Sequence, residues 1–103
     1  MNSPSRLLER ALGWTIVNRA GVLSLIKSFD FQDFTRGLDF TLHIGLLAHR
    51  ENHFPVLVVE SGRVTVSWST LGTERLQSQD FICAGKTDEI FRGPHSGTNS
   101  DEL

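Results

Sequence analysis

The stretch that decides the fold is Ala48-His49-Arg50-Glu51-Asn52-His53-Phe54-Pro55-Val56-Leu57-Val58-Val59, where a helical pattern passes into a strand pattern. Upstream, one face of a 3.6-residue helix begins near Asp33 and carries Phe34, Gly37, Phe40, Thr41, Ile44, Leu47 and Ala48. Pro55 stops the helix because proline has no N–H and its ring blocks the preceding turn. The unbroken apolar run 56–59 then predicts an interior strand.

The same helical segment carries a second apolar stripe, formed by Leu38, Leu42 and Leu46. A helix that packs on one sheet needs only one apolar face, so this stripe has two interpretations. It belongs either to a generously packed core or to a subunit interface. The second interpretation predicts a homodimer or a higher homo-oligomer.

Two hairpins flank this central helix. Residues 14–17, the turn-like residues 18–21 and the imperfectly alternating residues 22–31 predict the first. The run 56–59, the turn 60–63 and the alternating residues 64–69 predict the second, whose last strand has one solvent-exposed face. A short helix capped by Ser3 and ended by Gly13, and a final helix that starts at Gln77 or Ser78, complete the pattern. The order predicts an α+β fold (α-β-β-α-β-β-α), with a four-stranded antiparallel sheet and helices on one face.

Composition limits the class of protein. The chain has 103 residues, 39% of them hydrophobic, and a net charge of -2, which predicts one domain over residues 1–92 and a disordered tail over 93–103. The charge gives no reason to expect nucleic acid as a partner, and no apolar run is long enough to predict a membrane helix. A lone Cys83 cannot form an internal disulfide and is predicted to be a buried small hydrophobe. We therefore expect a cytoplasmic protein.

The histidines do not predict a metal site. His49 and His53 are four residues apart, but Glu51 does not fit the His-Glu-x-x-His pattern. His43 points about 120° away around the helix, so it cannot easily converge on the same ion. We interpret His49 and His53 as helix-end residues on the rim of a groove. With no nucleophile pattern and no phosphate-binding glycine motif, we expect no cofactor.

Several short motifs resemble the pterin-4a-carbinolamine dehydratase family, and the resemblance covers roughly residues 7–90. It begins with a leucine-rich start that leads to a tryptophan, here Leu8 and Leu12 before Trp14. Residues 29–34 match Phe-x-Phe-x-x-Phe, and residues 48–55 correspond to Ala-Glu-x-x-Asn-His-His-Pro. Residues 64–71 resemble Val-x-Val-x-Leu-x-Thr-His, with Trp68 at the leucine position. Residues 75–81 resemble Gly-Leu-Thr-x-x-Asp-Phe. The spacing of the motifs continues without a gap through Asp80.

The resemblance implies loss of water from a 4a-hydroxytetrahydropterin, with three histidines moving the protons. Here only His53 is retained, because Phe54 and Leu71 occupy the other two positions. The glutamate position holds His49, and Glu74-Arg75 replaces a pair of glycines at the mouth of the groove. The prediction is therefore a groove without a complete catalytic set, formed by His49, His53, Phe54, Pro55, Leu71 and Asp80.

Two functions follow from this reading. The first is a non-catalytic protein similar to a degenerate family branch that accompanies α-carboxysomes and is implicated there as a Rubisco assembly factor. Its expected partners are Rubisco subunits, and its expected location includes the carboxysome. The alternative is a dehydratase with a diverged site that uses His53 with His49. A different protein partner, as in the transcription-factor dimerisation role of some family members, or an unrelated small ligand remains a third class.

Overall fold

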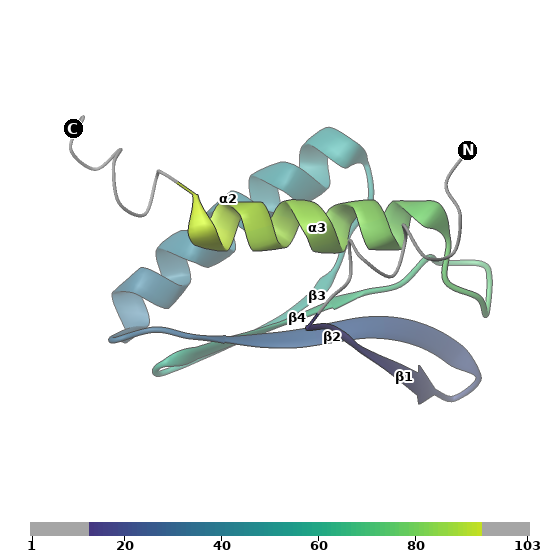
Figure 1. Ribbon diagram of the computed structural model, residues 1–103, viewed down its shortest axis with the longest axis horizontal. Helices are drawn as coiled ribbons and strands as arrows, with labels where there is room; N and C mark the ends of the chain where they lie inside the picture. Colours follow the sequence, from purple (N-terminus) through teal and green to yellow (C-terminus); the bar gives the residue numbers. More distant parts are fainter. Residues whose placement is uncertain (1–12, 94–103) are drawn as a thin grey trace.

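A computed structural model describes residues 13–93 as one antiparallel sheet with two helices on one of its faces (Figure 1). The strands are β1 (Thr15–Arg19), β2 (Val22–Asp30), β3 (Val56–Glu60) and β4 (Arg63–Trp68), and the helices are α2 (Phe34–Glu51) and α3 (Ser78–Arg92). The spatial order is β1-β2-β4-β3, and every neighbouring pair is antiparallel. The predicted α+β class and sheet are confirmed. The predicted first helix and the tail lie outside the described residues.

Tight turns set the register of both hairpins. Ala20 and Gly21 both have positive φ, at 54° and 88°, which is the conformation that two-residue hairpin turns require. The β1–β2 register pairs Ile16 with Leu25. In the second hairpin, Gly62 has a φ of 87°, and Val58 pairs with Thr65.

Helix α2 begins and ends through local hydrogen bonds. The Asp33 carboxylate accepts a hydrogen bond from the Arg36 N–H at 2.9 Å, which caps the first turn. Asn52 adopts the left-handed conformation, and the next residue, His53, donates its N–H to the Ala48 carbonyl at 3.1 Å. This termination redirects the chain so that His53 leaves the helix pointing toward α3.

The core lies between the sheet and the two helices. Phe40, Ile44 and Leu47 from α2 are buried as predicted, together with Val64, Val66, Trp68, Cys83 and other side chains of the sheet and α3. Cys83 is 0% exposed, so its predicted role as a buried small hydrophobe is confirmed. Phe34, which we placed on the core face, is instead 47% exposed. It occupies the first position of α2, one turn before the first buried residue pair of the helix, Gly37 and Phe40.

The prediction of an interior strand for residues 56–59 is wrong, because β3 is an edge strand. Leu57 and Val59 face the helices, whereas Val56 and Val58 point to the uncovered face of the sheet and are 57% and 48% exposed. Apolar side chains on both faces are also typical of a strand whose helix-free face contacts another surface. The interior position belongs to β4, which pairs with both β2 and β3, and its Ser67 is buried rather than solvent-exposed.

Candidate functional site

The centre of the site is a hydrogen bond between His53 and Asp80. The His53 Nε2 and Asp80 Oδ1 atoms are 2.6 Å apart, and the Asp80 side chain is fully buried. Since a carboxylate only accepts hydrogen bonds, Nε2 carries the hydrogen, and in the neutral ring Nδ1 is left as the acceptor. The ring is therefore held in one tautomer and one orientation.

Asp80 also holds the start of α3. Its second oxygen, Oδ2, accepts hydrogen bonds from the Thr70 hydroxyl at 2.9 Å and from the Gln77 N–H at 2.8 Å. A buried carboxylate needs such donors to offset the loss of water. One side chain thus ties together the end of α2, the loop 69–77 and the first turn of α3.

Trp68 forms the floor beneath His53. The two rings are stacked with centroids 5.6 Å apart and an angle of 7° between their planes. Trp68 is itself fixed, because its Nε1–H donates to the Thr87 hydroxyl at 3.0 Å and Thr87 donates to the Cys83 carbonyl. The imidazole therefore has a rigid support on one face and a buried acceptor on its Nε2 side.

A cleft of about 230 Å³ opens beside this imidazole. It is lined by Asn52, His53, Phe54, Ser69, Thr70 and Leu71. The two apolar replacements are both well exposed, since Phe54 is 63% and Leu71 is 95% exposed. The three positions that the resemblance assigned to histidines therefore do share one cleft, although two of them carry hydrocarbon side chains.

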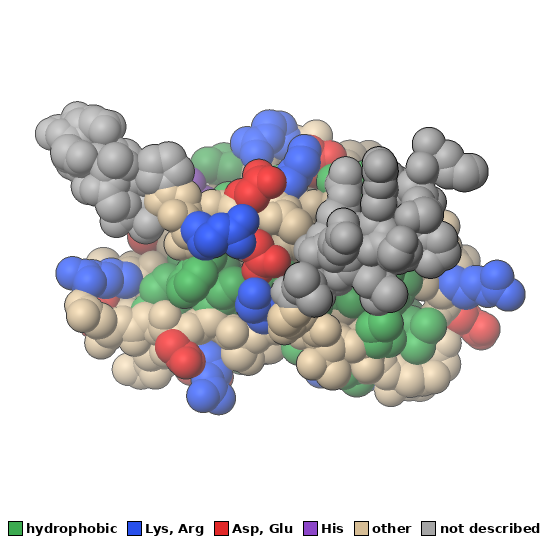
Figure 2. Space-filling model, in the orientation of Figure 1, with side chains coloured by type: hydrophobic (Ala, Val, Ile, Leu, Met, Phe, Trp, Pro, Cys, Tyr) green, Lys and Arg blue, Asp and Glu red, His purple; other side chains and the backbone are tan. Residues whose placement is uncertain are grey.

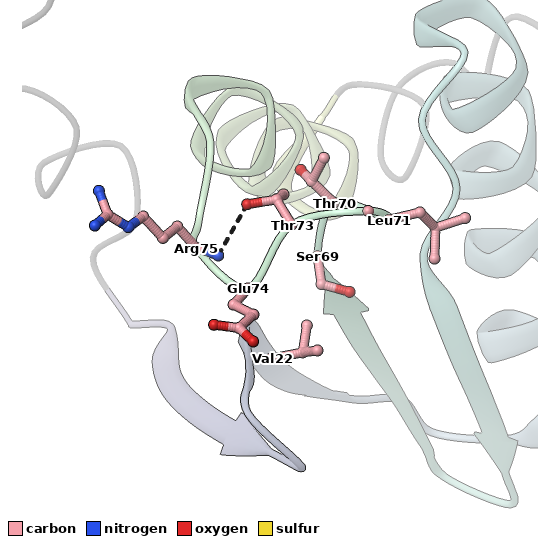
Figure 3. Close-up of a pocket in the computed structure, with 8 residues that line it drawn as sticks. Val22, Ser69, Thr70, Leu71, Thr73, Glu74 and Arg75 are labelled. Carbon is pink, nitrogen blue, oxygen red and sulfur yellow. Dashed lines mark hydrogen bonds between the residues drawn. The ribbon is translucent and has the colours of Figure 1, made fainter.

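A larger pocket of about 590 Å³ adjoins the cleft and shares Ser69, Thr70 and Leu71 with it (Figure 3). Glu74 and Arg75 line this second pocket together with Val22. In Figure 3 the Glu74 side chain lies beside Val22, whereas the Arg75 side chain extends away from the other labelled residues. The charged pair that we expected at the groove mouth thus borders the neighbouring pocket and is not among the residues that line the cleft.

The remaining predicted groove residues have other surroundings. His49 and Pro55 are not among the residues that line the cleft. Helix α2 ends at Glu51, so the four-residue helical spacing does not hold between His49 and His53. Sequence reasoning missed Trp68 and Thr70 as site residues. Thr70 could have been found, since it is the threonine of the Thr-His pair in the family motif. The stacking of Trp68 depends on a long-range contact that no local pattern specifies.

Two titratable groups near the site have shifted pKa values with structural causes. Hydrogen bonds from Lys86 and Gln79 lower the pKa of Glu51, which joins the end of α2 to α3 through a 2.8 Å contact with Lys86 Nζ. Burial raises the pKa of the Cys83 thiol to about 11. Within residues 13–93, no cluster of three or more His, Cys, Asp or Glu side chains could hold a metal ion. No helix in the same range is long and apolar enough to cross a membrane.

The fold and this histidine-centred cleft define the chain as a pterin-dehydratase-like protein. Residues 3–90 match the model of the family described as pterin 4 alpha carbinolamine dehydratase. The chain belongs to this family, as the motifs implied.

Named relatives and solved structures agree with that assignment. Two relatives are provisionally named pterin-4-alpha-carbinolamine dehydratase. The protein of Chlorobaculum tepidum is 43% identical to this chain, and the match spans 84% of this chain and 81% of the relative. The protein of Chlorobium luteolum is 40% identical, and the match spans 84% of this chain and 75% of the relative. A transcriptional coactivator/pterin dehydratase from Brucella melitensis has a similar structure, with a TM-score of 0.71, 26% identity and coverage of 86% of this chain and 96% of its own. A pterin dehydratase-like protein described as a RuBisCO assembly factor in the α-carboxysome shares the fold at a TM-score of 0.65 and 15% identity, over 76% of this chain and 88% of its own.

Proposed function

We propose that this chain is a non-catalytic member of the family whose cleft binds a protein partner. The observation that carries the proposal is the pairing of Phe54 and Leu71 beside His53 in one cleft. Dehydration of a 4a-hydroxytetrahydropterin needs one proton delivered to the leaving hydroxyl and another removed from the ring nitrogen. Neither a phenyl ring nor an isobutyl group can carry a proton, so one imidazole is left for two transfers.

The apolar side chains also give the cleft a binding role. Phe54 and Leu71 project into solvent at 63% and 95% exposure, next to the polar groups of Ser69 and Thr70. Exposed apolar groups around a cleft are typical of surfaces that another molecule covers. A partner segment with an apolar side chain could bury both residues, while the hydroxyl groups hydrogen-bond its backbone.

Incomplete Rubisco is the partner that we propose, and α-carboxysomes are the accompanying location. The support is the resemblance of the degenerate sequence together with a fold shared with a described RuBisCO assembly factor. An assembly factor must cover apolar surface on an unfinished complex, and the Phe54–Leu71 cleft offers apolar surface of its own.

Coexpression with Rubisco large and small subunits tests the proposal. Size-exclusion chromatography should show more assembled Rubisco in the presence of this chain, and the gain should disappear in the double variant Phe54→Ser, Leu71→Ser. Ile16→Ser is the matched control, because Ile16 is a 50% exposed apolar residue of β1 that does not line the cleft. Equal assembly with and without the chain, and no complex with either subunit, would contradict the proposal.

A second candidate, a dehydratase with a diverged site, is favoured by the intact His53–Asp80 pair and by the names of the relatives. In this mechanism His53 would move protons through Nδ1, because Nε2 is held by Asp80. A turnover assay with a 4a-hydroxytetrahydropterin separates the candidates. A rate above the uncatalysed background that is lost in His53→Gln supports the dehydratase, whereas a rate equal to background supports the binding protein.

A further inference from the structure

Acidic side chains that contact α3 have basic partners. Lys86 Nζ lies 2.8 Å from Glu51 Oε2, and Lys27 Nζ lies 2.8 Å from Asp88 Oδ1. Acidic and basic side chains also lie beside one another on the face of the molecule where α3 is seen (Figure 2). Glu74 differs, because its carboxylate forms no ion pair with any Lys, Arg or His side chain of the described residues.

Glu74 borders the pocket of about 590 Å³ that adjoins the cleft beside His53. Its side chain lies beside Val22, whereas the guanidinium of the next residue, Arg75, points away from both (Figure 3). The Glu74 carbonyl accepts a hydrogen bond from the Leu23 N–H at 3.0 Å, which attaches this loop to β2. The pocket therefore presents a carboxylate on an anchored backbone, next to an apolar side chain.

We propose that this pocket, called here the Glu74 pocket, receives an arginine or lysine side chain of the bound partner; the inference rests on the proposed protein-binding function. Such a side chain has an apolar stem and a cationic end. The stem would contact Val22 and Leu71, which both line the pocket, and the cation would pair with the carboxylate. Hydroxyl groups of Ser69 and Thr73 in the same lining can accept further hydrogen bonds from the cation.

The Glu74 pocket and the cleft beside His53 are adjoining parts of one groove, since they share three lining residues that include Leu71. Phe54 lines only the cleft, and Glu74 lines only the pocket. A partner segment that lies over Leu71 can therefore place an apolar side chain against Phe54 and a basic side chain beside Glu74. The recognised segment should combine an apolar residue and a basic residue a few positions apart.

A pool of short peptides, with leucine fixed at one position and random residues elsewhere, tests this preference. Peptides retained by the immobilised wild-type chain should be enriched at least about threefold in arginine or lysine at a constant distance from the leucine. Glu74→Gln should lose the basic enrichment, and Glu74→Lys should select aspartate or glutamate instead. Glu60→Gln is the matched control, because Glu60 is an exposed carboxylate that borders a separate pocket.

Fluorescence polarisation with the most enriched peptide measures the contribution of the ion pair. Replacing the basic residue of the peptide by glutamine should weaken binding to the wild type by at least about threefold at low salt. The loss should shrink at high salt, because salt screens an exposed ion pair. The same replacement should leave the affinity for Glu74→Gln unchanged, since the partner charge is then already absent.

Three results would overturn the inference. Selection of apolar residues without a basic preference would do so while leaving the proposed protein-binding function in place. A basic preference that persists in Glu74→Gln would assign the cation to another surface. No enrichment on the wild type would also overturn it, and the Rubisco coexpression assay, which uses no peptide, then decides the proposed function separately.

Discussion

At the scale of single residues, Asp80 explains why part of a catalytic motif is present in a site that lacks the rest. The carboxylate, in the first turn of α3, accepts hydrogen bonds from His53 after the end of α2 and from Thr70 and the Gln77 backbone in the loop 69–77. The pair therefore has a structural role that does not depend on turnover. A chain that lost dehydration would still lose stability if it lost Asp80.

We expect Asp80→Asn to lower the free energy of unfolding by on the order of 2 kcal/mol, because it leaves buried donors without a charged acceptor. Urea unfolding followed by tryptophan fluorescence measures this change. Asp39→Asn is the control, since Asp39 is 62% exposed and its removal should change stability little. A midpoint equal to that of the wild type would contradict a structural role for Asp80.

The arrangement of the cleft predicts that histidines at positions 54 and 71 would increase the rate of dehydration. His53 is already oriented by Asp80 and Trp68, and positions 54 and 71 line the same cleft. We expect the double variant Phe54→His, Leu71→His to dehydrate a 4a-hydroxytetrahydropterin faster than the wild type, because general acid–base groups contribute about 10²-fold or more.

The control for this gain is Phe54→Asn with Leu71→Asn. These side chains make the cleft polar without supplying a group that titrates near neutral pH. A rate increase in the asparagine pair equal to that in the histidine pair would show that polarity, rather than proton transfer, limits the reaction.

At the scale of elements, local chemistry predicted the helices and hairpins better than their positions in the sheet. The predicted start of α2 near Asp33 was confirmed, and Ser78, the first residue of α3, was one of its two predicted starting points, because both starts depend on neighbouring residues. The order β1-β2-β4-β3 depends instead on long-range pairing. The run 56–59 is equally compatible with an interior strand and with an edge strand that is apolar on both faces.

The observed strand order leads to a prediction that distinguishes the edge strand β3 from the central strand β4. Val58 on edge strand β3 is 48% exposed, whereas Val66 on central strand β4 is fully buried. We expect Val66→Thr to cost about 1–3 kcal/mol of stability, because it buries a hydroxyl group in an apolar core. Val58→Thr should cost about 0.5 kcal/mol or less. Equal losses for the two variants in chemical unfolding would contradict the assigned positions.

At the scale of the whole molecule, the site forms only when distant segments meet. The family resemblance predicted that positions 53, 54 and 71 lie in one groove, and all three line one cleft in the structure. The hydrogen bond between His53 and Asp80 spans 27 residues, and a helix-start aspartate has a sufficient local explanation in the helix dipole. Of the six residues predicted for the groove, His53, Phe54 and Leu71 line the cleft, and no sequence pattern indicated the contacts that hold His53 in place.

The packing of the whole molecule also controls the reactivity of Cys83. Its side chain lies in the core, and burial raises its pKa to about 11 from an ordinary value of 9.0. The thiolate is the reactive form, so the folded protein should react slowly near neutral pH. We expect iodoacetamide at pH 8 to label the native chain at least about 100-fold more slowly than the urea-unfolded chain, because labelling requires opening of the core.

The raised pKa of Cys83 also makes the free energy of unfolding depend on pH in the alkaline range. The unfolded chain releases the thiol proton near pH 9, whereas the folded chain retains it until about pH 11. The contribution of the neutral thiol to stability is therefore complete below pH 9 and is lost as the pH rises toward 11. Comparing urea midpoints of the wild type and Cys83→Ala at pH 8 and pH 10 isolates this contribution from other titrating groups. Between pH 8 and pH 10 the urea midpoint of the wild type should fall by more than that of Cys83→Ala. If the difference between the two midpoints is the same at both pH values, or if iodoacetamide labels the native chain rapidly at pH 8, the thiol is not enclosed by the core.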